Sequence, residues 1–119
     1  MTTPRIADFR DAPVPVDSPI DPAKLIAGEP HPTVDNRYSD ASQQFHCGIW
    51  TSRPGKWRVS YAEHEFCHLL AGRVRLTGED GRAVEFGPGD AFVVPSGFTG
   101  TWETLEAARK YYAIFERSG

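Results

Sequence analysis

The sequence has few side chains that bind transition metals and no long apolar segment. Among 119 residues there are two cysteines, four histidines and one methionine. No apolar run approaches the roughly 20 residues that cross a bilayer, so we expect no membrane partner. Residues 1–5 lack the apolar core of a signal peptide. We therefore expect a cytoplasmic protein, in which Cys47 and Cys67 are reduced thiols.

Basic charge is also scarce. Lysine and arginine number 13 against 16 acidic residues, which gives a net charge of -3, and the basic residues form no cluster. A chain that lacks a basic patch has little affinity for the phosphate backbone, so we expect no nucleic-acid partner. The 39% hydrophobic content and the chain length are those of one globular domain.

Glycine and proline, in contrast, are abundant, with 11 and 10 residues. Proline recurs through the first 40 residues, where it prevents a long helix or a central strand. One short helical turn is predicted over residues 21–28, with Asp21 as its cap, Pro22 in its first turn and Gly28 at its end. We expect residues 1–43 to form an N-terminal arm that packs on a domain formed by residues 44–119.

From residue 44 onward the pattern predicts short strands separated by Gly and Pro turns. The expected strands cover 45–50, 57–62, 65–70, 73–77, 83–86, 91–94, 100–105 and 111–116. The runs 91–94 and 111–115 are apolar on both faces, whereas a strand with one solvated face alternates with polar residues. The arm or a second copy must cover the outer side, and we expect a homodimer.

Two spaced motifs resemble those of the cupin superfamily. The second cupin motif is a glycine, five residues, Pro-x-Gly, two residues and a histidine. This chain matches it with Gly89 and with Pro95-Ser96-Gly97, but Gly100 stands at the position of the histidine. Glu65 and Gly72 have the spacing of the end of the first motif, but its two histidines are missing. The resemblance implies an all-β fold, the double-stranded β-helix or jelly-roll cupin barrel.

The segments 65–72, 86–90 and 97–103 are similar to one cupin branch. That branch includes ureidoglycine aminohydrolase, an ethanolamine-utilisation protein and many short bacterial proteins without an assigned activity. Because one fold supports many chemistries, the resemblance leaves the function to be argued from the site.

A catalytic cupin metal site resembles three imidazoles and one carboxylate, which must converge on one ion. This chain has only His31, His46, His64 and His68. His64 and His68 share a strand face but stand about 13 Å apart along it. Glu65 is adjacent to His64 and faces the opposite way.

If Glu65 points into the barrel, as the resemblance implies, Trp102 also points inward from the second motif, two residues after Gly100. Indole would then fill the space that an ion occupies in related proteins. We expect no transition metal and no cofactor. The open alternative is a bulge over residues 61–65 that brings Glu63, His64 and His46 to a weak metal site.

Three functions remain open. The first is a binding module for a small polar or cationic metabolite, whose site is formed by Glu63, Glu65, Trp50, Trp102 and Tyr112. The second is an enzyme, hydrolase-like or isomerase-like and acting on an amine or ureide, with Glu65 as general base and Tyr61 as proton donor. The third is a structural dimer without a ligand, whose barrel would be filled completely by side chains.

Overall fold

The computed structural model describes residues 3–117, and the strands in this range form an all-β fold without a helix. None of these residues belongs to a helix long and apolar enough to span a membrane. The strands are β1 Val16–Asp17, β2 Leu25–Gly28, β3 Thr33–Ser39, β4 Phe45–Ser52, β5 Gly55–Ser60, β6 His64–Gly78, β7 Ala83–Phe86, β8 Ala91–Val94 and β9 Thr99–Phe115. The predicted cupin jelly roll is confirmed.

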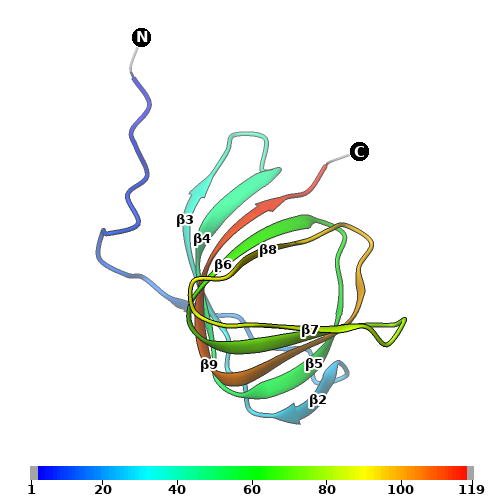
Figure 1. The fold of residues 1–119 in the computed structure, drawn as a ribbon. Coiled ribbons are helices and arrows are strands. Elements are labelled where there is room, and N and C mark those ends of the chain that lie inside the picture. Colours follow the sequence, from blue (N-terminus) through cyan, green and yellow to red (C-terminus); the bar gives the residue numbers. More distant parts are fainter. Residues whose placement is uncertain (1–2, 118–119) are drawn as a thin grey trace.

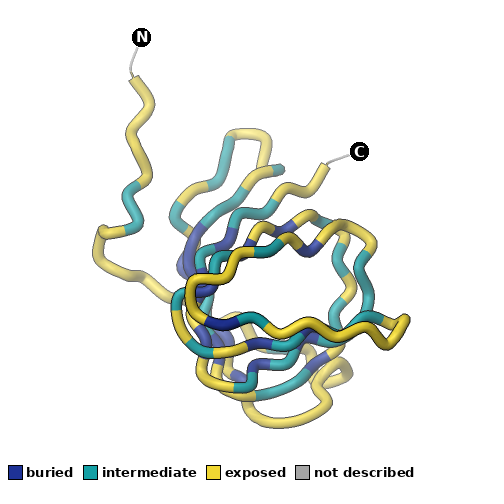
Figure 2. The backbone as a smooth tube through the Cα atoms, in the orientation of Figure 1, coloured by how far each residue is buried: buried dark blue, intermediate teal, exposed yellow. Residues whose placement is uncertain are grey.

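The strands make one antiparallel sheet that curls into two facing layers (Figure 1). The long strands β6 and β9 pair along their whole length and run through both layers. The first layer has the order β1-β3-β4-β9-β6-β8, and the second has the order β2-β5-β9-β6-β7. The inward side chains of both layers form the core. Figure 2 shows buried backbone segments in the strands of both layers.

The predicted strand breaks within the two long strands are wrong. Residues 65–70 and 73–77 belong to β6, and residues 100–105 and 111–116 are joined by β9, which runs to Phe115. The β6–β9 register shifts at Leu69, Ala71 and Arg73, so the strands bend while remaining paired. Gly72 lies in this bend with φ +84°, a conformation that is accessible to glycine.

The N-terminal segment contributes more strand than expected. The predicted helical turn over 21–28 is wrong beyond Lys24, whose amide donates to the Asp21 carbonyl (2.8 Å). The following residues form β2, because its backbone groups find partners in β5. Strand β3, also within 1–43, pairs with β4. Residues 3–15, before β1, form an arm on the outside of the barrel beside β3 (Figure 1).

Candidate functional site

A buried ion pair lies between the two layers of the barrel. Glu65 comes from β6 and Lys110 from the neighbouring strand β9, and both side chains point inward. Lys110 Nζ lies 3.1 Å from Glu65 Oε2. The side chains of Lys110 and Glu65 are only 3% and 8% exposed. The core of this protein therefore contains a cation and an anion that solvent scarcely reaches.

Aromatic rings and a thiol complete the surroundings of the Lys110 ammonium. Its Nζ lies 4.6 Å from the ring centroid of Trp50 and 4.2 Å from that of Trp102, within the range of a cation–π contact. The two indoles meet edge to face at 5.3 Å. Nζ also donates to Cys67 Sγ at 3.4 Å. The ammonium is thus bound by one carboxylate, one thiol and two ring faces.

Both oxygens of Glu65 have a partner. The Tyr61 hydroxyl donates to Glu65 Oε1 at 2.9 Å, while Lys110 occupies Oε2. Burial raises the pKa of Tyr61, and the Glu65 carboxylate raises it further. Tyr61 therefore keeps its proton at neutral pH. The result is a hydrogen-bonded chain that runs from Tyr61 through Glu65 to Lys110.

The protonation of Lys110 depends on its neighbours. Burial alone would lower its pKa, but the Glu65 carboxylate, with a contribution from Cys67, outweighs burial and raises it. Burial raises the pKa of Cys67 to about 12, although the Lys110 ammonium opposes this increase. Lys110 is thus an ammonium and Cys67 a neutral thiol, so neither is a nucleophile at neutral pH.

A cavity of about 270 Å³ opens beside this ion pair. Residues 18–20 of the N-terminal segment close one side. Its aromatic and charged walls are Trp50, Trp57, Tyr61, Glu63, Glu65, Trp102 and Lys110. Among its lining residues Lys110 is the only basic one, and it is already paired with Glu65. Glu63 therefore leaves the cavity with an excess of negative charge.

The structure brings most of the predicted site residues together. Glu63, Glu65, Tyr61, Trp50 and Trp102 all line this cavity. Tyr112 also points inward, but it does not line the cavity, and its hydroxyl donates to Asn36 Oδ1 at 2.8 Å.

Sequence reasoning missed Lys110 and the lining role of Trp57. Lys110 was overlooked because the last strand was expected to start at 111. Alternation back from the inward-facing Tyr112 would have placed Lys110 on the inner face. Trp57 pairs directly with Trp102 across β5 and β9, and the two rings stack at 6.4 Å.

These donors do not fit the metal centre that the cupin resemblance implies. Lys110 Nζ occupies the space between Glu65 Oε2 and Cys67 Sγ, and an ammonium cannot coordinate an ion. Within residues 3–117, no three His, Cys, Asp or Glu side chains form a group that could hold a metal. At Gly100, an added Cβ would lie 2.0 Å from the Thr77 carbonyl oxygen, so this backbone has no room for a histidine.

The bulge considered as an alternative does not recruit the histidines. His64 Nδ1 accepts from the Ser96 amide at 3.1 Å. His46 contacts Ser39 Oγ at 2.6 Å and the Gln43 carbonyl at 3.1 Å. Neither imidazole lines the cavity beside Glu65.

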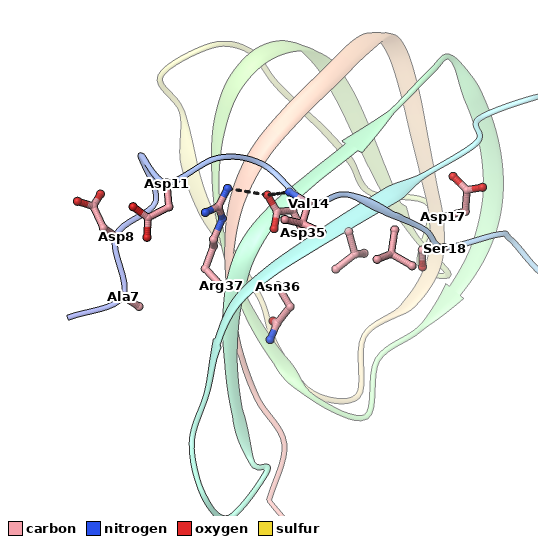
Figure 3. A pocket seen from close by; sticks show the side chains of 11 residues that line it. Ala7, Asp8, Asp11, Val14, Asp17, Ser18, Asp35, Asn36 and Arg37 are labelled. Carbon is pink, nitrogen blue, oxygen red and sulfur yellow. Dashed lines mark hydrogen bonds and ion pairs between the residues drawn. The ribbon is translucent and has the colours of Figure 1, made fainter. Parts of the chain in front are cut away.

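A larger cavity of about 720 Å³ lies outside the barrel, between the arm and β3 (Figure 3). Asp35 is its central group, and it accepts from Arg37 (2.8 Å) and from the Val14 amide (3.3 Å). The other lining carboxylates belong to Asp8 and Asp11 of the arm and to Asp17 of β1, and Asp17 lies at the opposite end from the other two (Figure 3). Both cavities contain a buried ion pair, since the side chains of Arg37 and Asp35 are each only 9% exposed. We take the barrel cavity as the candidate site because its ion pair lies inside the barrel, where Lys110 also contacts two indole rings.

The jelly-roll fold and the residues inside the barrel together define a cupin whose cavity is lined by a buried ion pair, Glu65 and Lys110. The chain belongs to the EutQ-like cupin domain family, whose model matches residues 39–112. A comparison with curated proteins gave no match.

Solved structures support the fold. A DUF861 protein of unknown function from Pseudomonas syringae pv. tomato has a TM-score of 0.79 and 30% identity over 90% of this chain and 46% of that chain. The present chain thus spans about half the length of that protein. A DUF861 protein from Thermotoga maritima is 34% identical, with a TM-score of 0.55 over 56% of this chain and 76% of that chain.

A more distant structure shows the fold alone. The putative ethanolamine utilisation protein from Salmonella typhimurium has 14% identity and a TM-score of 0.67, covering 93% of this chain and 99% of that chain.

Proposed function

We propose that this cupin binds a small polar or cationic metabolite in the barrel cavity beside Glu65 and Lys110. The observation that carries the proposal is that the lumen is not filled by side chains. A cavity of about 270 Å³ remains next to the ion pair, slightly below the roughly 300 Å³ at which pockets for drug-sized ligands begin. The ligand is therefore smaller than a drug-sized molecule.

The walls of the cavity favour a ligand with positive charge. Three indoles line the cavity, of which Trp57 and Trp102 are buried and Trp50 is half-buried, so Trp50 is the ring that a ligand reaches most easily. Indole attracts cations through its electron-rich face. Lys110 neutralises Glu65, whereas Glu63 supplies a carboxylate that no basic lining residue offsets. An ammonium group could bind Glu63 while the carbon chain of the ligand packs on the rings.

A calorimetric titration with ethanolamine tests the proposal. Ethanolamine is a small primary ammonium, and the name of the Salmonella relative refers to its utilisation. Ethylene glycol is the neutral control, because it replaces the ammonium with a hydroxyl. We expect ethanolamine to bind and ethylene glycol to bind at least about tenfold more weakly, since tenfold corresponds to about 1.4 kcal/mol.

Glu63→Gln separates the proposed site from non-specific binding, because the amide keeps the shape and removes the charge. Glu79→Gln, in the exposed β6–β7 turn, is the matched control. We expect Glu63→Gln to weaken ethanolamine binding and Glu79→Gln to leave it unchanged. Equal affinities for the two ligands, or equal affinities in the two variants, would refute a cation site at Glu63.

Proton transfer is a second candidate function, and the chain from Tyr61 through Glu65 to Lys110 favours it. Three titratable groups are hydrogen-bonded in series at the wall of a cavity. Glu65 accepts from two donors, but a carboxylate has about four acceptor positions, so it can still accept a proton from a ligand in the cavity. Deuterium incorporation into a ligand with an acidic C–H, followed by NMR and lost in Glu65→Gln, tests this function.

A further inference from the structure

A second cavity, of about 370 Å³, lies directly beside the barrel cavity. The two cavities share six lining residues: Pro19, Ile20, Trp57, Val59, Tyr61 and Glu63. We call the second one the outer cavity, because the buried residues Glu65, Trp102 and Lys110 line only the barrel cavity. Since Glu63 lines both, the two cavities meet at its carboxylate.

The outer cavity contributes two basic residues that the barrel cavity lacks. Lys24 and Arg58 line it, and both residues are exposed. Their backbones are joined, because the Arg58 amide donates to the Lys24 carbonyl at 2.9 Å. This hydrogen bond holds the turn over residues 21–24 against β5 and places the two basic residues side by side.

Neither of these two cations is neutralised within residues 3–117. The Lys24 and Arg58 side chains take part in no ion pair or hydrogen bond among these residues. Asp21 also lines the outer cavity, but its carboxylate accepts from the Ala23 amide of its own turn at 3.0 Å. Two neighbouring cations without a counterion repel each other. An anionic group that binds between them would therefore be stabilised.

The junction of the two cavities has the opposite charge and an apolar wall. Glu63 forms no ion pair within the described part of the chain, so its carboxylate is available to a cation. Ile20 and Val59 line both cavities and are half-buried against the core. A ligand that extends from Glu63 into the outer cavity would pack its carbon chain on these two side chains and end beside the two cations.

We propose that the ligand of this cupin is a zwitterion, a short ω-amino acid whose ammonium binds Glu63 and whose carboxylate binds Lys24 and Arg58. This inference rests on the proposed function, because it takes the cation site at Glu63 as given. A guanidinium can donate two parallel hydrogen bonds to one carboxylate, and a lysine adds a compact positive charge. A plain amine uses only one end of such a site and should bind less tightly.

Calorimetric titration of the full chain with matched pairs of ligands tests the inference. The amino acids are β-alanine, γ-aminobutyrate and δ-aminovalerate. Each control is the amino alcohol of the same chain length, which keeps the ammonium and replaces the carboxylate with a hydroxymethyl group. We expect the amino acid whose length fits the site to bind about tenfold or more tightly than its amino alcohol, because the control lacks the charged hydrogen bonds.

Lys24→Gln and Arg58→Gln test whether the carboxylate binds in the outer cavity. Each variant should bring the affinities for the amino acid and its amino alcohol close to each other. Both residues are exposed, so the loss of either charge should leave the fold intact. Lys56→Gln is the matched control, because it removes the same charge from β5 at a residue that lines neither cavity. It should keep the wild-type preference for the amino acid.

The outcomes separate this inference from the proposed function. If ethanolamine and the amino alcohols bind but no amino acid binds more tightly, the zwitterion is overturned while the cation site at Glu63 stands. The same conclusion follows if Lys24→Gln and Arg58→Gln keep the wild-type preference. An amino acid that binds equally well to Glu63→Gln is held as an anion only, which also overturns the inference. If neither the amines nor the amino acids bind, both proposals fail.

Discussion

Lys110 and Glu65 determine the character of the interior. Two buried charges are costly to desolvate, and their attraction offsets that cost only while both are present. Their hydrogen bonds to each other and to Tyr61 and Cys67 meet this requirement. The ion pair therefore adds little net stability to the fold. Its main effect is to fix the positions of the Glu65 and Lys110 side chains in the barrel.

Removing one partner of the pair should be far more damaging than removing both. We expect Lys110→Met to lower the free energy of unfolding by about 3–5 kcal/mol, because Glu65 is left as an unpaired buried charge. Adding Glu65→Gln to Lys110→Met should recover most of this loss. Urea denaturation measures both values.

The exposed pair Arg73 and Glu85, 4.0 Å apart, provides the control for this experiment. Its side chains are more than a third exposed, so Arg73→Met should cost less than about 1 kcal/mol. A Lys110→Met variant that is no less stable than Arg73→Met would contradict the buried pairing.

Glu63 should make ligand binding depend on pH. Burial raises its pKa above the ordinary value of 4.5, and Glu116 and Glu65 raise it further. A cation binds the ionised form, so its affinity should fall with decreasing pH and should begin to fall at a higher pH than an ordinary glutamate would produce. Titrations of ethanolamine between pH 8 and pH 5 measure this. In Glu63→Gln the part of the pH dependence that comes from Glu63 should be absent. If the affinity of this variant for ethanolamine depends on pH as in the wild type, the pH dependence comes from another group.

At the scale of single elements, the bend in β6 depends on close contact between β6 and β9. An added Cβ at Gly72 would lie 2.2 Å from the Ala107 carbonyl oxygen, whereas at Gly89 it would meet nothing within 4 Å. Both glycines have positive φ, at +84° and +90°. The two positions thus differ in crowding while they share the same backbone conformation.

This contrast predicts different costs for the same substitution. We expect Gly89→Ala to destabilise the protein by about 1 kcal/mol, the cost of positive φ for alanine. Gly72→Ala should cost at least about 2 kcal/mol more, because β9 must move as well. Thermal unfolding compares the two variants, and equal costs would show that the crowding at Gly72 relaxes freely.

The strands differ in how well they could be predicted from the sequence. The Gly, Pro and apolar spacing was enough for a fold of short strands, and the resemblance to cupins supplied the jelly roll. With Glu65 inward, as that resemblance implies, alternation was enough for Cys67 and Leu69. Turn residues did not reveal that β6 and β9 continue through their bends, since pairing between distant segments maintains those strands. The same misplaced boundary concealed Lys110, because lysine is rarely buried without a partner and its partner lies 45 residues earlier.

At the scale of the whole molecule, several buried groups make stability depend on alkaline pH in the same direction. Burial raises the pKa of Cys67 from 9.0 to about 12, and the pKa values of Tyr61 and Lys110 are also raised. A group with a raised pKa retains its proton in the folded state longer than in the unfolded state. Its stabilising contribution is present below the unfolded pKa and is lost as pH rises through the folded pKa.

We therefore expect stability to decline from about pH 9 upward. Cys67 alone should contribute a slope of up to about 1.4 kcal/mol per pH unit between pH 9 and pH 12. Cys67→Ala should reduce this slope, whereas Cys47→Ala, at a half-buried thiol, should reduce it less. Urea denaturation at pH 7, 9 and 10 measures the slope. A stability that is constant over this range would contradict the buried thiol.

Across the molecule, the central feature is the cation of Lys110, which is held inside the barrel between Glu65 and Cys67. The most direct test of the interior is a crystal structure with anomalous data collected above the iron, nickel and zinc edges. The result we predict is Lys110 Nζ between Glu65 and Cys67, in contact with the rings of Trp50 and Trp102, and no anomalous peak among them. A metal peak at about 2.0–2.3 Å from Glu65 or Cys67, with Lys110 displaced, would contradict the account.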